Sequence, residues 1–181
     1  LDLSDQRFSV ETVTQDFAPD VTETVIKFPS PLHSPWPANN MVWAHLLVPT
    51  SAQGRRAPAV LVLPVLAAPN IWIETQFIRR FVRDGNIVMW LEMPTQFHRR
   101  PDPSQPSGEV FLARNPQRLR ENFRQAVLDS RRALGVLMMR PEVDPSRVAL
   151  FGISLGAIVG SALYAVDHRA CYAIFLLGGA D

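Results

Sequence analysis

The feature that most constrains the fold is an alternation of short apolar segments with helical ones. The apolar segments are 59–63, 86–93, 148–151 and 171–177. Continuous apolar runs of this length are typical of strands buried on both faces. The segments with helical spacing between them are 73–84, 115–137 and 155–166. This order predicts an α/β fold with a mainly parallel sheet and helices on both of its faces.

Two β-rich segments precede this alternation. Residues 21–28 alternate in polarity as a half-buried strand does, and residues 41–48 follow as a second strand, expected antiparallel to the first. We expect the chain, residues 1–181, to be a single domain whose core starts at about residue 57. Val143–Arg147 is expected to be a turn, and Cys171 a buried strand residue.

The motif that carries chemistry is Gly152-Ile-Ser-Leu-Gly156, a match to G-x-S-x-G between an apolar strand and an apolar helix. That context is the one a nucleophile elbow requires, because the serine must stand on a sharp strand-to-helix turn. The alternative is a Gly/Ser turn in a nucleotide-binding fold. No glycine follows Leu63 before Asn70, where a dinucleotide-binding loop would need its glycines, and no P-loop motif occurs.

With this motif and order of elements, the chain resembles the α/β-hydrolase superfamily, in particular its esterase and dienelactone-hydrolase-like branches. The resemblance implies a serine hydrolase that cleaves a carboxylic ester or thioester through an acyl-enzyme on Ser154. It implies an oxyanion hole made by the backbone N–H groups of Leu155 and Leu66, with Val65 as the alternative to Leu66. It implies neither a metal ion nor an organic cofactor.

The chain departs from the family pattern at its C-terminal side. In the family the acid and the histidine of the triad follow the serine, after later strands. Here the last two strands of the fold are not evident. The only later histidine, His168, is expected at the far end of a helix, and Asp181 is a possible acid. We therefore expect the remainder to be absent, to come from a second chain, or to have been lost in an inactive relative.

Other residues could shape a substrate site. His98 lies in the loop after the strand 86–93, with Arg99 and Arg100, and this loop should overhang the edge that presents Ser154. The alternative is a solvated basic turn. Trp72 starts a helix beside the expected oxyanion loop, where it would either cover a pocket or pack in the core.

Composition narrows the partners. The chain has 18 basic and 17 acidic residues, so its formal net charge of +1 gives no reason to expect nucleic acid. Its single cysteine excludes a multi-cysteine metal site, and its longest apolar stretch, 57–69, is too short to span a membrane. We expect a small-molecule substrate, a soluble chain with the cytoplasm slightly favoured, and a second copy or chain covering the last strand. Two other functions stay open: an inactive binding or assembly module, and a peptidase or acyltransferase.

Overall fold

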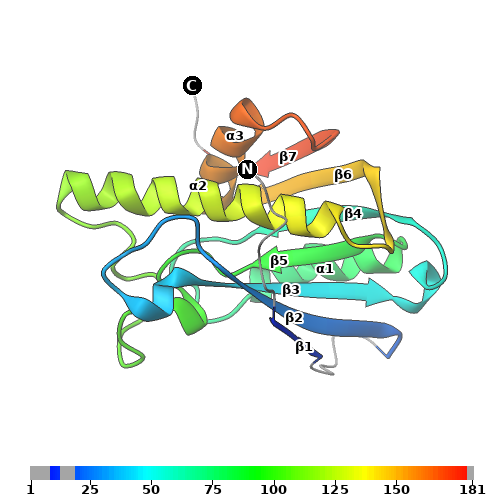
Figure 1. Cartoon of the computed structure of the whole chain (residues 1–181), viewed down its shortest axis with the longest axis horizontal. Coiled ribbons are helices and arrows are strands. Elements are labelled where there is room, and N and C mark those ends of the chain that lie inside the picture. The colour runs from blue at the N-terminus through cyan, green and yellow to red at the C-terminus, as the bar shows by residue number, and fades with distance from the viewer. Residues whose placement is uncertain (1–8, 13–18, 179–181) are drawn as a thin grey trace.

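A computed structural model describes residues 9–12 and 19–178 of the chain. The described part contains a seven-stranded sheet with the strand order β1-β2-β3-β5-β4-β6-β7, flanked by three α-helices (Figure 1). The strands are β1 (Ser9–Thr12), β2 (Val21–Pro29), β3 (Met41–Pro49), β4 (Ala57–Leu63), β5 (Ile87–Leu91), β6 (Val143–Ile153) and β7 (Tyr172–Leu176). The α-helices are α1 (Trp72–Arg83), α2 (Pro116–Met138) and α3 (Leu155–Val166), and the short 3-10 turns are η1 (Pro37–Asn40), η2 (Thr50–Ala52) and η3 (Phe97–Arg99).

The sheet is mixed, as the sequence predicts. Strands β1, β2, β3 and β5 pair antiparallel in succession, whereas β5, β4, β6 and β7 pair parallel. Each crossover through a helix brings the chain back to start the next strand at the same end of the sheet, so these strands run parallel. Strands β5 and β6 lie on opposite sides of β4, which gives the order β5-β4-β6. The carboxyl ends of the four parallel strands therefore meet at one edge, which is where a ligand site is expected.

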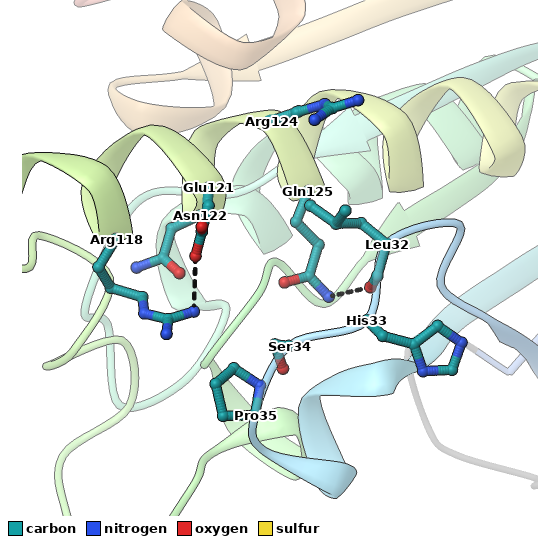
Figure 2. Close-up of a pocket in the computed structure, with 9 residues that line it drawn as sticks. All are labelled: Leu32, His33, Ser34, Pro35, Arg118, Glu121, Asn122, Arg124 and Gln125. Atoms are coloured by element: carbon teal, nitrogen blue, oxygen red, sulfur yellow. Dashed lines mark hydrogen bonds and ion pairs between the residues drawn. The ribbon is translucent and has the colours of Figure 1, made fainter.

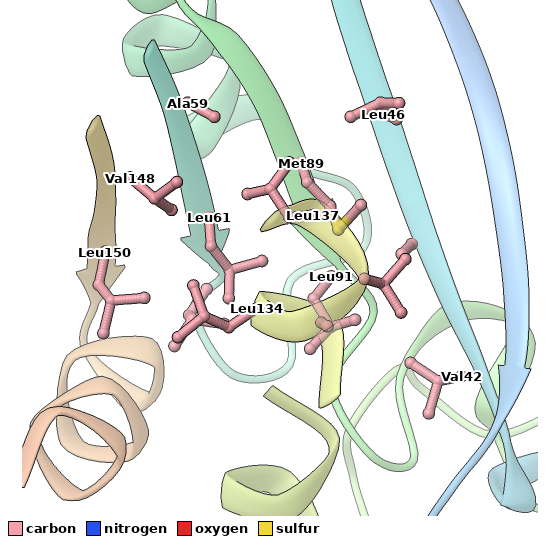
Figure 3. Packing of buried hydrophobic residues seen from close by; sticks show 14 of the residues in the cluster. Val42, Leu46, Ala59, Leu61, Met89, Leu91, Leu134, Leu137, Val148 and Leu150 are labelled. Atoms are coloured by element: carbon pink, nitrogen blue, oxygen red, sulfur yellow. The ribbon is translucent and has the colours of Figure 1, made fainter. Parts of the chain in front are cut away.

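Two apolar layers hold the helices to the sheet. On one face, Leu134 and Leu137 of α2 pack with Leu61, Met89 and other strand residues into the larger cluster (Figure 3). On the other face, Ile78 and Val82 of α1 pack against β4, β5 and β6. The helices thus cover both faces, which confirms the layered α/β architecture.

Helix α2 begins where its cap residues predict. Asn115 accepts hydrogen bonds at Oδ1 from the backbone N–H groups of Gln117 (2.9 Å) and Arg118 (3.1 Å), and Pro116 takes the first helical position. Helix α3 has the predicted bounds, since it follows Ser154 directly and ends at Val166.

Three local expectations are wrong. Strand β6 starts at Val143, where a turn was expected, because Val143 already pairs with Ala57 of β4. The pairing then shifts to Val148 opposite Ala59, and the intervening Asp144 accepts a hydrogen bond from the Ser146 N–H. Strand β7 starts after Cys171, and Cys171 is exposed because it precedes the strand at the sheet end opposite the elbow. Strand β1 was not foreseen, since a four-residue segment offers too short a pattern.

Candidate active site

Ser154 occupies the turn between β6 and α3 with φ 52° and ψ −113°. A residue with a side chain rarely adopts this backbone conformation, and it persists only where the surroundings hold it. The Ser154 N–H donates to the Leu176 carbonyl oxygen (2.8 Å), and its own carbonyl oxygen accepts from Ala157 (3.0 Å) and Ile158 (3.1 Å). The turn is therefore fixed between β7 and the first turn of α3, while no described residue forms a hydrogen bond with the Ser154 hydroxyl.

Close packing explains both glycines of the motif. A Cβ atom on Gly152 would overlap the Gly156 carbonyl oxygen, and one on Gly156 would overlap the Leu63 carbonyl oxygen. A Cβ on Gly160 would overlap the Phe175 ring. Helix α3 can begin directly above the ends of β4 and β6 only because these positions lack side chains.

The two backbone N–H groups that sequence reasoning favoured as oxyanion donors have no acceptor among the described residues. They are those of Leu155, at the start of α3, and of Leu66, in the loop after β4. The neighbouring Val65 N–H is engaged instead, because it donates to Glu74 Oε1 at 2.7 Å. Of the two loop residues that sequence reasoning left open as oxyanion donors, only Leu66 thus keeps a free N–H.

The loop after β4 is held in place from two sides. Gln96 donates from Nε2 to the Val65 carbonyl oxygen (3.0 Å), and Gly108, at φ 77°, lies so close that a Cβ there would be 3.0 Å from the Ala67 nitrogen. Glu74 is fully buried in the first turn of α1, and burial raises the pKa of its carboxyl. The loop conformation therefore depends on the segment 95–108 and on α1.

His98 does not meet Ser154 in the described structure. Its Nδ1 lies 2.7 Å from Glu92 Oε1, and its ring stacks on Trp43 of β3 at 4.1 Å. These contacts lie on the β3 side of β5, whereas Ser154 follows β6, and β4 runs between those two strands. The prediction of a substrate-shaping His98 beside the serine is not supported by its contacts.

Sequence reasoning missed a buried polar group around Glu92. His45 Nδ1 lies 2.9 Å from Glu23 Oε1, and its Nε2 lies 3.2 Å from Glu92 Oε1. We call Glu23, His45, Glu92 and His98 the Glu92 cluster. One signal was available: His45 is two residues from both Trp43 and Leu47 along β3, so it shares their face of the sheet, which is the α1 side.

The charged groups of the Glu92 cluster shift one another's pKa values. Burial alone would lower the pKa of His45, but hydrogen bonds and opposite charge from Glu23 and Glu92 raise it overall. The hydrogen bond with Glu92 also raises the pKa of His98. Burial alone would raise the pKa of Glu92, yet its two histidine partners lower it. The imidazolium and carboxylate forms thus favour each other.

The neighbours of His98 differ from the solvated basic turn considered above. Arg99 is fully buried and pairs with Asp129 Oδ2 at 2.6 Å, because it turns inward beneath α2. Arg100 is half-buried and donates to the carbonyl oxygens of Phe97 (2.9 Å) and Gln105 (3.1 Å). The basic turn is therefore held by the buried Arg99, and of its two guanidinium groups only that of Arg100 is partly exposed.

The remaining candidates are separated from Ser154 or lie outside the described residues. Trp72 is 68% exposed at the start of α1, so it packs neither in the core nor over an enclosed pocket. His168 is exposed beyond the end of α3, and twelve helical residues span about 18 Å. Asp181 lies outside the described residues.

Two pockets lie at or near this edge. One, of about 230 Å³, is lined by Ala67, Pro69, Phe97, Arg100, Pro106 and Ser107. The other, of about 400 Å³, lies between the loop 32–35 and α2 (Figure 2). In it Arg118 already pairs with Glu121 at 2.8 Å and Gln125 donates to the Leu32 carbonyl oxygen at 3.3 Å, so several of its polar groups are engaged.

Residues 9–12 and 19–178 contain no group of three or more His, Cys, Asp or Glu side chains placed to hold a metal ion. None of the helices in that part of the chain combines the length and apolarity needed to cross a bilayer.

Solved structures share this architecture. The chain superposes on the acetyl xylan esterase from Paenibacillus sp. R4 with a TM-score of 0.69 and 19% identity, over 93% of this chain and 52% of that one. For acetyl xylan esterase 1 from Thermoanaerobacterium sp. JW/SL YS485 the values are 0.67, 17%, 93% and 51%. The chain has the α/β-hydrolase fold. A glucuronoyl esterase from Solibacter usitatus also matches, with a TM-score of 0.63 and 16% identity over 96% of this chain and 52% of that one.

This α/β-hydrolase fold spans about half the length of the solved esterases that it matches. No protein-family model and no curated protein matches the sequence. At these identities the likeness establishes the fold, and the activity has to be argued from the site.

Proposed function

We propose that this chain contributes the nucleophile and the oxyanion hole of a serine ester hydrolase. The observation that carries the proposal is the strained backbone of Ser154, and the unpaired N–H groups of Leu155 and Leu66 support it. Backbone strain that the surroundings maintain clusters at functional sites. The fold shared with solved esterases supports the same function.

In the first half of the reaction, Ser154 Oγ attacks the carbonyl carbon of the ester, and its proton passes to a general base. The carbonyl oxygen becomes an oxyanion that accepts hydrogen bonds from the N–H groups of Leu155 and Leu66. The N-terminus of α3 adds a favourable dipole at this point. The carbon–oxygen bond to the leaving group then breaks, the alcohol departs with a proton from the base, and an acyl-enzyme remains.

In the second half, water attacks the acyl carbon after giving a proton to the same base. The bond to Ser154 Oγ breaks, the serine recovers its proton, and the carboxylic acid leaves. A donor in the oxyanion hole is worth about 10²–10³ in rate in comparable enzymes. Blocking the free Leu66 N–H should therefore slow the reaction by about 10²–10³.

The general base and its acid are proposed to come from outside the described residues. Among the described histidines, His45 and His98 are bound to Glu92, His33 lies in the loop 32–35 beside α2, and His168 lies beyond the opposite end of α3. A serine hydroxyl without a base is a weak nucleophile. We therefore expect little or no turnover from residues 1–181 alone, although the site can still react with strong electrophiles. The substrate is proposed to be a small or medium carboxylic ester or thioester.

A fluorophosphonate probe tests the proposal, because it phosphonylates activated serines. We expect covalent labelling at Ser154 in the protein that carries this chain, and none in the Ser154→Ala variant. Ser161→Ala is the matched control, since Ser161 lies on α3 with its hydroxyl bonded to the Ala157 carbonyl oxygen. An unlabelled protein, or label that persists in Ser154→Ala, contradicts the proposed nucleophile and favours a binding module.

A further inference from the structure

The 230 Å³ cavity beside the loop after β4 is built as an anion site. Arg100 is its only charged lining residue, and Pro69, Phe97 and Pro106 give it apolar walls. Arg100 uses Nε on the Phe97 carbonyl oxygen and Nη1 on the Gln105 carbonyl oxygen, so the guanidinium is held by the backbone. One Nη1 hydrogen and both Nη2 hydrogens have no acceptor among the described residues.

The other polar side chain of the cavity is also a free donor. Ser107 is 8% exposed, and its Oγ accepts the Phe97 N–H at 3.1 Å, while its own hydrogen has no acceptor among the described residues. None of the six lining residues is acidic. Hydrogen bonds from Ser104, and to a smaller extent the charge of Arg100, lower the pKa of the nearby Asp102, although no Arg100–Asp102 hydrogen bond forms. A pocket with only donors to offer suits an acceptor, and a guanidinium fork matches a planar carboxylate.

The walls of the cavity are preorganised. Ala67 and Phe97 have positive φ angles of 58° and 45°, as does Thr95 at 65°, although none of them is glycine. Gly108 packs against Ala67 between the two loops. Such strain is maintained by the surroundings and clusters at ligand clamps. A fixed cavity saves the cost of ordering loops when a ligand binds.

The cavity shares the loop after β4 with the proposed oxyanion hole. A Cβ on Gly156 would be 2.9 Å from the Pro64 carbonyl oxygen, so the start of α3 touches the loop that lines the cavity. Leu66, the proposed oxyanion donor, directly precedes Ala67 of the cavity wall. A substrate held at the Leu66 N–H can therefore extend one arm toward Arg100.

We propose that this cavity binds a carboxylate carried by the substrate, with Arg100 as the specificity-determining residue and Ser107 as a second donor. The substrate class is then a half-ester of a dicarboxylic acid. This inference rests on the proposed esterase function, but binding can be measured without catalysis.

Calorimetric titration of the Ser154→Ala variant with monomethyl glutarate and with its neutral counterpart dimethyl glutarate tests the proposal. We expect the anionic half-ester to bind at least tenfold more tightly, and Arg100→Gln to remove that preference. Arg79→Gln is the matched control, because Arg79 is an exposed arginine on α1 without a partner among the described residues. Equal binding of the two esters, or a preference that survives Arg100→Gln, overturns the proposal.

Arg100→Gln also removes two bonds to loop carbonyls, so the variant could lose its fold. In that case the NMR signal of the Arg100 Nε–H group in the Ser154→Ala protein decides. A saturable shift with monomethyl glutarate supports the site, and an unchanged signal overturns it. Fluorophosphonate labelling separates the two proposals: labelled Ser154 without an anion preference refutes only this inference, whereas an anion preference without labelling refutes only the nucleophile.

Discussion

The elbow at Ser154 and the Glu92 cluster lie at the same edge of the sheet, yet they treat their polar groups in opposite ways. At the elbow, a serine hydroxyl and the Leu155 N–H have no partner among the described residues, and the backbone is strained. In the Glu92 cluster, three of the four side chains are buried and joined by hydrogen bonds. Glu23 and His45 lie on β2 and β3, whereas Glu92 directly follows β5 and His98 lies in η3.

This difference teaches which catalytic-looking residues to trust. Buried polar groups are paired because an unpaired one is costly, so a histidine between two carboxylates is explained by stability alone. The strained backbone of Ser154 has no such explanation within the fold, although the Leu155 N–H is unpaired as at any helix start. The residue types are more suggestive in the Glu92 cluster, but the geometry favours the elbow.

The largest expected effect on stability comes from removing Arg99, which bonds the Glu92 carbonyl oxygen and pairs with Asp129. Arg99→Met leaves Asp129 buried without its partner and removes the bonds from Arg99 to the carbonyl oxygens of Glu92 and Asn39. Breaking a buried ion pair from one side costs about 3–5 kcal/mol. Urea denaturation should show a loss of this size in the free energy of unfolding.

The double variant Arg99→Met with Asp129→Leu sharpens that test. Replacing both charges by apolar groups removes the uncompensated carboxylate, so part of the lost stability should return. Arg79→Met, at an exposed arginine, should change the free energy of unfolding by less than about 0.5 kcal/mol. A single Arg99 variant as stable as the parent would mean that the Arg99–Asp129 ion pair does not stabilise the fold.

The second effect concerns the elbow. Gly156→Ala places a methyl group on the Leu63 carbonyl oxygen, which forces α3 away from β4. Overpacking of this kind costs about 2–3 kcal/mol, and displacement of α3 should also abolish fluorophosphonate labelling of Ser154. Gly54→Ala is the control: it has a positive φ of 73° but no atom within 4 Å, so it should cost about 1 kcal/mol and leave labelling intact.

The sequence reached the elbow but not the Glu92 cluster, for a physical reason. The elbow is local in sequence: the strand, Gly152–Gly156 and the helix follow one another directly. Gly152 is required by Gly156 nearby, although Gly156 itself is required by Leu63 of β4. The Glu92 cluster joins Glu23, His45 and His98 from three separate segments, and only the sheet pairing brings them together. For the same reason Arg99 was expected in solvent, since its partner Asp129 lies 30 residues away.

The Glu92 cluster should make the stability of the fold depend on pH, because its groups have shifted pKa values. The pKa of His45 is raised in the folded state, so the stability it contributes is complete below its ordinary value of 6.5 and is lost as pH rises above that value. The pKa of Glu92 is lowered, so its contribution is lost as pH falls below its ordinary value of 4.5. Thermal unfolding should therefore show the greatest stability between these values.

His45→Gln should flatten the loss on the alkaline side. At pH 6 it should cost about 1.5 kcal/mol, the range for hydrogen bonds to charged groups, and the cost should shrink as pH rises. His168→Gln, at an exposed histidine beyond α3, should keep the slope of the parent. A pH profile that is the same in His45→Gln and in the parent would contradict the charged bridge between Glu23 and Glu92.

The smallest effect on stability is expected at Glu74, which is buried like the Glu92 cluster but has an unpaired oxygen. The other oxygen of this carboxyl holds the Val65 N–H of the loop after β4. Burial raises its pKa, so its contribution to stability is complete below the ordinary value of 4.5 and declines as pH rises. Glu74→Gln keeps the acceptor without the charge and should change stability at pH 7 by less than about 1 kcal/mol, with labelling of Ser154 unchanged. Glu74→Ala frees the Val65 N–H and should slow labelling through loss of the loop's position, so equal labelling rates in the two variants would show that the loop holds its shape without this bond.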